Sequence, residues 1–166
     1  MQIRTHIKVS APAEKAWEVI GEQFGDFGKW TTALSSSSLR GELGVGATRV
    51  CHTNGFGPFP AMIAEEQLVD FNPEQKRYTY VVHKGLPAMF NRAQNAWSIE
   101  TVDKTSCIIH SHVTLELKVW LRPFSWIFTL LIKRDMKKFF DEMDYFITNG
   151  EIHPRKTKSI PEPAST

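Results

Sequence analysis

The sequence lacks the features of several protein classes. Its two cysteines, Cys51 and Cys107, are too few for a disulfide framework and lack the spacing of metal ligands. Its 20 Lys and Arg oppose 18 Asp and Glu, and a net charge of +2 gives no basic surface for nucleic acid. The longest apolar stretch, Val119 to Ile132, is shorter than the roughly 20 residues of a spanning helix. We therefore expect a cytoplasmic protein with no disulfide, no metal or other cofactor, and no nucleic-acid partner.

The apolar content supports a single folded domain. Apolar residues make up 42% of the 166 residues and aromatic residues 11%, which is too much for a disordered chain. Residues 2–10 alternate between apolar and polar, which predicts a half-buried strand and shows no hydrophobic signal-peptide core. Ser10 and Pro12 then predict the start of a helix. Glycines break up the segment after it, so we expect a short second helix or an irregular connection there.

The middle of the chain reads as a series of strands. A weak strand signal covers 35–42, and stronger signals cover 47–53, 61–71, 76–84, 91–102 and 105–119. The segments NGFGPFP, NPEQ, GLP and VDKT supply turn signals between them. Consecutive strands with short turns predict an antiparallel meander. Several of the runs are long, and long antiparallel strands twist and curl, so we expect a strongly curved sheet.

The last predicted element is a long amphipathic helix that begins at Pro123 and ends near Thr148. Its apolar positions recur at steps of three and four, and the opposite face carries Lys133, Lys137 and acidic residues. Asn149-Gly150 follows as a stop signal. We therefore expect one folded domain over residues 1–150 and a disordered, proline-rich tail over residues 151–166.

This element order predicts an α+β fold in which a curved antiparallel sheet wraps around the long C-terminal helix, with short helices after the first strand. The chain resembles the helix-grip superfamily, which includes START lipid-transfer domains, birch-pollen-type allergens and the polyketide cyclase/dehydrase group. The resemblance rests on SAPAEKAWEVI, GVGATRVCHTNG, AEEQLVDFNPEQKRYTYVV, GLPAMFNRAQNAW and the helix introduced by RP, and it covers about residues 3–150. It implies a cavity for a hydrophobic ligand between the sheet and the helix.

Arg49 and Glu66 are the first candidate site residues. A hairpin about the NGFGPFP turn places Arg49 opposite residue 65 or residue 66, so its partner is either Glu65 or Glu66. In similar proteins positions 49 and 66 face the cavity. The resemblance then implies a ligand anchor, with Arg49 binding a carboxylate or carbonyl and Glu66 binding a hydroxyl. The alternative is an exposed cross-strand salt bridge worth less than about 1 kcal/mol.

Tyr78, Tyr80 and His110 are further candidates. The hairpin through NPEQ places Tyr80 near Glu66, where a phenol could orient a ligand or donate a proton; alternatively the tyrosines only fill the gap between sheet and helix. His110 and His112 share one strand face. The apolar alternation of their neighbours directs both histidines outward, whereas the resemblance directs His110 toward the cavity. We therefore take Glu66, Tyr80 and His110 as the catalytic candidates, and no third ligand accompanies the histidines to form a metal site.

The remaining predicted ligand contacts come from several segments. The resemblance places Trp30 near the cavity mouth, although it could equally be a core residue. Arg92 could add a polar lining, but the strand pattern does not decide which way it points. From the long helix we predict three apolar contacts, Phe139, Phe140 and Met143.

The sequence is consistent with three functions. The first is a carrier or sensor that binds a small hydrophobic or lipid-like ligand. The second is a polyketide cyclase/dehydrase-type enzyme, in which the cavity folds the substrate and a side chain moves protons. The third is a lipid-handling protein that contacts a membrane through the apolar run 120–132 and its basic flanks.

Overall fold

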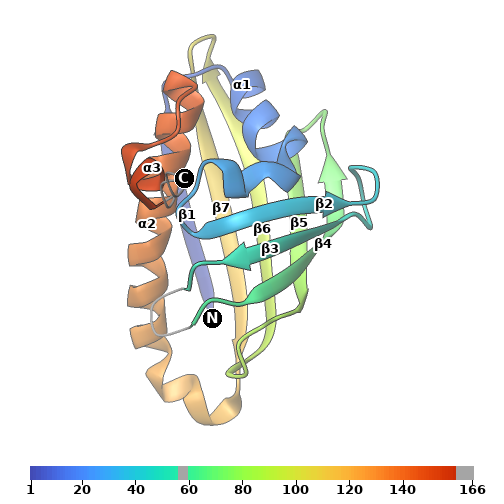
Figure 1. Cartoon of the computed structure of the whole chain (residues 1–166), viewed down its shortest axis with the longest axis vertical. Coiled ribbons are helices and arrows are strands. Elements are labelled where there is room, and N and C mark those ends of the chain that lie inside the picture. The colour runs from blue at the N-terminus through green and yellow to red at the C-terminus, as the bar shows by residue number, and fades with distance from the viewer. Residues whose placement is uncertain (56–59, 160–166) are drawn as a thin grey trace, which may run out of the picture.

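A computed structural model describes residues 1–55 and 60–159 and shows one curved sheet wrapped around one long helix (Figure 1). The strands are β1 (Gln2–Val9), β2 (Leu34–Arg40), β3 (Thr48–Thr53), β4 (Ile63–Asn72), β5 (Arg77–Lys84), β6 (Phe90–Asp103) and β7 (Ser106–Leu117). They pair antiparallel in the order β1-β7-β6-β5-β4-β3-β2. The first strand thus adds to the end of a meander, and the predicted helix-grip α+β fold is confirmed. The predicted NGFGPFP turn lies partly outside the described residues.

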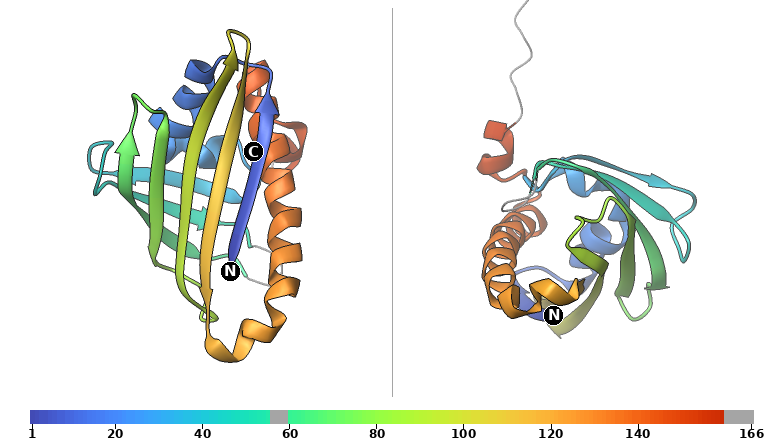
Figure 2. Two further views of the ribbon diagram at one scale, coloured as in Figure 1. Left: turned by 180° about the vertical axis from the view of Figure 1, so that it is seen from behind. Right: turned by 90° about the horizontal axis from the view of Figure 1, so that it is seen from below.

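The helices are short except for one. Between β1 and β2 lie α1 (Ala13–Trp17), the π-helical turn η1 (Glu18–Glu22) and the 3-10 helix η2 (Phe24–Lys29). After β7 come the 3-10 helix η3 (Val119–Phe124), α2 (Ser125–Asn149) and α3 (Pro154–Ser159). Figure 2 shows from behind and from below how the sheet curls around α2. Among residues 1–55 and 60–159, no helix combines the length and hydropathy needed to cross a bilayer.

The two ends of α2 follow from local chemistry. Pro123 lies inside η3, so the α-helix begins two residues later than the proline signal predicts. Gly150 adopts φ 72°, and its N–H donates to the carbonyl of Phe146 at 2.9 Å. A residue in the left-handed region satisfies the last helical carbonyls without a Cβ clash, so the helix ends where Asn149-Gly150 predicts.

The chain after α2 is more ordered than the sequence predicts. Disorder is expected over 151–166, but residues 154–159 form α3, and residues 160–166 lie outside the described part. Lys156 is buried, and its Nζ donates to the carbonyl of Leu34 at 2.6 Å. Composition alone misses this contact, because the partner carbonyl lies more than a hundred residues earlier.

Glu142 of α2 explains why this segment docks. The carboxylate is fully buried and accepts hydrogen bonds from the hydroxyls of Thr31 and Thr32 and from the Thr32 N–H. Arg155 of α3 adds a cation, with Nη1 3.9 Å from Glu142 Oε1. Because a buried charge is costly unless it is paired and hydrogen-bonded, this cluster joins α3, α2 and the segment before β2.

The helices after β1 pack directly on β2. A Cβ atom on Gly28 would lie 2.5 Å from the backbone nitrogen of Ser37, so only glycine permits this approach. The Ser37 hydroxyl bonds both sides of the contact, donating to the Gly25 carbonyl and accepting from the Gly28 N–H. The close contact holds η2 against the inner face of the sheet.

Aromatic side chains fill this half of the molecule. Phe27 and Phe139 both contact Trp30, with ring centroids 5.0 and 5.1 Å from it. The same cluster contains Trp17, Phe24, Tyr78, Trp97 and Phe140. These ring contacts pack the inner face of the sheet against the later turns of α2.

The turn between β6 and β7 gives a test by pH. Bonds from the Thr105 N–H, the Ser106 hydroxyl and the Thr105 hydroxyl lower the pKa of Asp103 to about 2. Because the folded pKa lies below the unfolded value, this stabilisation is present at neutral pH and is lost as the pH falls from about 4 to about 2. We expect an NMR titration of the Asp103 carboxyl to give a midpoint near 2 and Asp103→Asn to flatten acid unfolding in that range. A midpoint near 4 would contradict these bonds.

Candidate functional site

A cavity of about 330 Å³ lies between the inner face of the sheet and α2. This volume is at the lower end of the range for small-molecule sites. Its walls are mainly the apolar side chains of Leu34, Met62, Ala64, Val82, Leu86, Phe90, Val113, Leu115 and Ile132. Among its lining side chains are the polar groups of Thr53, Glu66 and Tyr80. The site is therefore an apolar pocket with a few polar groups.

Arg49 supports the polar side of the cavity from behind. The strands pair Arg49 with Glu66, which settles the register left open by the sequence. Arg49 Nε donates to Glu66 Oε2 at 2.7 Å, Nη2 donates to the same oxygen, and Nη1 donates to the Phe24 carbonyl at 2.9 Å. The guanidinium carbon also lies 3.9 Å from the Phe24 ring centre and 4.3 Å from that of Phe27. These contacts fix the orientation of the Glu66 carboxylate.

The surroundings of Arg49 keep its guanidinium charged. Burial of Arg49 opposes its charge and is the largest single effect, but attraction by Glu66 and smaller contributions from Cys51, Tyr80 and Tyr78 together raise the Arg49 pKa. Arg49 is only 3% exposed and does not line the cavity. The predicted role of Arg49 as a direct anchor for a ligand is therefore not supported, because its donors already bind Glu66 and Phe24. Arg49 is a positioning residue for Glu66.

Glu66 presents one oxygen for a new partner. Its Oε2 accepts the bonds from Arg49 and also faces the thiol of Cys51 at 3.4 Å. Burial raises the pKa of Cys51 to about 12, so the thiol stays protonated and donates. Within the described residues no hydrogen bond reaches Glu66 Oε1. Because Glu66 lines the cavity, this oxygen can accept a hydrogen bond from a guest there.

Tyr80 supplies the complementary group. Burial, and secondarily the negative charge of Glu66, raises the pKa of Tyr80 well above its usual value. The phenol therefore stays protonated at neutral pH and can donate a hydrogen bond. Tyr80 and Glu66 both line the cavity, so the site offers a neutral donor together with a charged acceptor. The prediction that these two side chains share one polar region thus agrees with the geometry.

Several predicted contacts lie in the aromatic core instead of the cavity. Tyr78 and Trp30 are each 1% exposed, and Trp30 is the core residue that the sequence left as an alternative. Phe140 and Met143 are buried in the same cluster, and Phe139 packs against it. None of these five lines the cavity. The apolar face of α2 continues along the whole helix, so periodicity cannot show which turn faces open space.

Ile132 is the α2 residue that lines the cavity, and the prediction did not include it. It lies on the same apolar face, in an earlier turn than Phe139 and Phe140. The strand residues Val82, Val113 and Leu115 were also missed. Their alternation with polar neighbours marks them as inward-facing, but that pattern does not separate a lining residue from a packed one.

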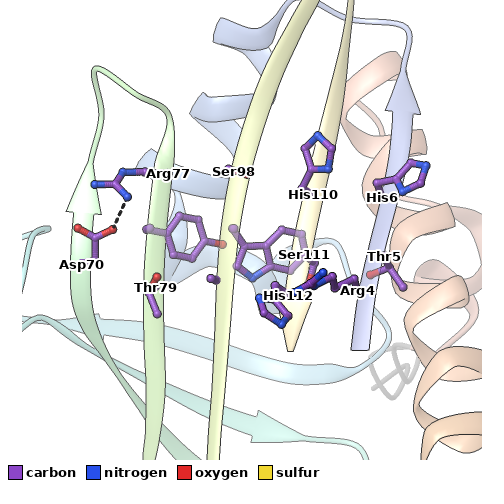
Figure 3. Close-up of a pocket in the computed structure, with 13 residues that line it drawn as sticks. Arg4, Thr5, His6, Asp70, Arg77, Thr79, Ser98, His110, Ser111 and His112 are labelled. Carbon is purple, nitrogen blue, oxygen red and sulfur yellow. Dashed lines mark ion pairs between the residues drawn. The ribbon is translucent and has the colours of Figure 1, made fainter. Parts of the chain in front are cut away.

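His110 and Arg92 lie on the opposite face of the sheet, so their predicted place in the cavity is wrong. His110 and His112 line a groove of about 490 Å³ on the outer face. His110 lies beside His6 there, and His112 lies beside Arg4 (Figure 3). His110 Nε2 lies 3.2 Å from Glu100 Oε2, and Arg92 donates to the Gln94 side chain. The apolar alternation gave the correct direction for His110 and the resemblance did not.

The comparisons place the chain among known folds. The family model described as "Polyketide cyclase / dehydrase and lipid transport" matches residues 1–144. No curated protein matches the sequence significantly. A START superfamily protein from Mycobacterium smegmatis is 10% identical with a TM-score of 0.72, over 88% of this chain and 96% of that one. At these identities the likeness to a solved structure shows the fold alone.

Two further solved structures have the same fold. Norcoclaurine synthase from Thalictrum flavum, solved with dopamine and hydroxybenzaldehyde, is 17% identical with a TM-score of 0.66, over 89% of this chain and 86% of that one. Ara h 8.0201 is 14% identical with a TM-score of 0.68, over 89% and 97% of the two chains.

Proposed function

The chain belongs to the polyketide cyclase/dehydrase and lipid transport family, and on that basis we propose that it is a carrier or sensor for a small, mainly apolar molecule with a hydrogen-bond-donating head group. An alcohol or an amine is the chemical class that fits best. The observation that carries this proposal is Glu66, which lines an apolar cavity: Arg49 holds one oxygen, and no hydrogen bond from the described part of the chain reaches the other.

The charge of the site favours this class over a fatty acid. An ionised carboxylate accepts hydrogen bonds and cannot donate them. A ligand carboxylate would meet the Glu66 charge, and Arg49 cannot compensate because it is already paired. Two carboxylates in one buried site cannot easily both be ionised. A hydroxyl or ammonium group instead donates a hydrogen bond to Glu66. A hydroxyl can also accept a hydrogen bond from Tyr80.

A cyclase/dehydrase-type enzyme is the second candidate. Glu66 and Tyr80 line one cavity and could act as a base and an acid on a polyketide-like substrate. The norcoclaurine synthase structure holds dopamine and hydroxybenzaldehyde in a protein of this fold. However, the raised pKa of Tyr80 makes it a poor acid near neutral pH, where efficient catalysis needs a matched pKa. The geometry therefore supports binding more strongly than proton transfer.

A cytoplasmic location accompanies the proposal. Cys51 and Cys107 are both free and buried, which suits a reducing compartment. The proposed site uses no cofactor, since hydrogen bonds and apolar packing account for the ligand contacts.

The experiment is displacement of a polarity-sensitive fluorescent dye by 1-decanol, decylamine and decanoate. We expect decanol and decylamine to compete at least about tenfold better than decanoate, because charge-assisted hydrogen bonds contribute about 1.5–3 kcal/mol. Glu66→Gln should remove most of this preference. Glu65→Gln is the matched control, because Glu65 pairs with Lys84 and His83 and does not line the cavity. Tighter binding of decanoate, or no effect of Glu66→Gln, would contradict the proposal.

A further inference from the structure

The tip of the molecule, formed by η3 and the first turns of α2, exposes large apolar side chains. Trp120 is 70% exposed and Trp126 is 62% exposed. We call the tip surface the exposed side chains of Val119, Trp120, Phe124, Trp126, Ile127 and Leu130. The other three tryptophans are buried. Contiguous exposed apolar side chains of this size mark an interaction site more often than ordinary surface.

Basic residues predominate around the tip surface, with Glu116 beside Arg122 as an acidic neighbour. Lys118, Arg122, Lys133 and Arg134 flank the tip surface, and no Asp or Glu occurs between Glu116 and Asp135. Within residues 1–55 and 60–159, none of these four cations forms an ion pair. The basic flanks are therefore free to meet an anionic partner.

The tip surface adjoins one end of the cavity. The Lys118 N–H donates to the Met89 carbonyl at 3.0 Å. Met89 belongs to the loop between β5 and β6, whose Leu86 and Pro87 line the cavity. Both segments lie at the same end of the molecule in Figures 1 and 2. Whatever covers the tip surface therefore lies next to the cavity.

We propose that the tip surface docks on an anionic lipid bilayer. Tryptophan is enriched at membrane interfaces because its ring is apolar and its N–H is polar. The exposed apolar side chains would enter the boundary between head groups and acyl chains, while the flanking Lys and Arg would contact lipid phosphates. A second copy of the chain fits poorly, because a tip-to-tip contact would bring two sets of unpaired cations together. This inference stands without the proposed function, and only an exchange of ligand with the membrane would depend on it.

The first test is co-sedimentation of the full chain with vesicles of phosphatidylcholine, alone or mixed with phosphatidylglycerol. We expect binding to the mixed vesicles and at least about tenfold weaker binding to phosphatidylcholine alone, because basic residues near the surface are attracted to anionic lipids. Trp120→Ala/Trp126→Ala and Arg122→Glu should each weaken binding to the mixed vesicles at least about tenfold. The assay contains no ligand for the cavity, so its result does not depend on whether the proposed ligand binding is correct.

Lys104→Glu is the matched charge control. Lys104 is exposed in the turn between β6 and β7, at the opposite end of the molecule (Figure 1). Lys104→Glu replaces one positive charge by one negative charge, as Arg122→Glu does at the tip surface. Equal loss of binding in Lys104→Glu and Arg122→Glu would overturn the proposal, because it would show attraction by net charge alone. Because the tip residues are exposed, all variants should keep the melting temperature of the natural chain.

Tryptophan fluorescence gives a second readout. We expect lipids brominated in the acyl chain to quench part of the emission of the natural chain on mixed vesicles. Trp120→Phe/Trp126→Phe should abolish that quenching, because only the buried tryptophans remain. No quenching in the natural chain would overturn the proposal. A second outcome would also overturn it: the natural chain self-associates with rising concentration, the double variant does not, and neither protein binds vesicles. A second copy of the chain would then cover the tip surface.

Discussion

Replacement of Arg49 by methionine is expected to lower the free energy of unfolding by about 3–5 kcal/mol. Arg49 is 3% exposed, and its donors bind Glu66 and the Phe24 carbonyl. The substitution leaves Glu66 without its cation and removes the guanidinium from the ring of Phe24. Chemical denaturation of the two proteins under identical conditions gives the measurement.

A double substitution separates the pair from its surroundings. Arg49→Met/Glu66→Leu removes both charges, and buried pairs replaced by apolar groups are often neutral in stability. We therefore expect the double variant to recover most of the stability that Arg49→Met loses. A loss below about 1 kcal/mol in Arg49→Met would instead identify an ordinary surface pair and would contradict the buried geometry.

Val113→Trp is expected to weaken ligand binding by more than about a hundredfold, or about 2.7 kcal/mol. Val113 lines the cavity from β7, and an indole there would occupy the space that the guest needs. Its effect on the free energy of unfolding should stay below about 1.5 kcal/mol, because the added volume enters a cavity and not a packed core. The dye displacement described above, with decanol as the ligand, measures the change.

The control for this substitution is Val69→Trp. Val69 lies in β4, is 45% exposed and does not line the cavity. The same change of side chain at this position should leave the affinity for decanol within about threefold of the natural value. If both tryptophan variants bind decanol like the natural chain, the ligand does not occupy this cavity.

Much of the fold could be predicted from local patterns. Strand alternation and turn residues indicate an antiparallel meander, and steps of three and four residues indicate the long helix. The Arg49–Glu66 contact was one of two registers that the hairpin allowed, and a shift of one residue would have exchanged Glu66 for Glu65. Alternation also predicted correctly that His110 faces outward, because Cys107 and Ile109 occupy the inward row.

The predictions that were wrong concern features that depend on packing between distant segments. Phe139, Phe140 and Met143 share an apolar face with Ile132, yet only Ile132 lies beside the cavity. The difference arises because η2 fills the space next to the later turns of α2, and no local pattern shows where a neighbouring element ends. The prediction of a disordered tail missed α3 for a similar reason. The buried Glu142 pairs with Arg155 of α3, and the composition of the tail does not reveal that partner.

The proposed cavity site and the tip surface consist of different residues. Glu66 and Tyr80 define the polar side of the cavity, and Trp120 and Trp126 define the tip. Variants at one surface should leave the other unaffected, because additivity holds for separated sites. A protein that loses vesicle binding but keeps its affinity for decanol would show this independence.

The most direct measurement is a crystal structure of the chain with 1-decanol. We expect the alkyl chain to lie between Phe90, Val113 and Ile132, with the hydroxyl within hydrogen-bond distance of Glu66 Oε1. An alcohol bound in the outer groove beside His110, or one whose hydroxyl lies away from Glu66 in the inner cavity, would contradict the proposal that Glu66 selects the ligand.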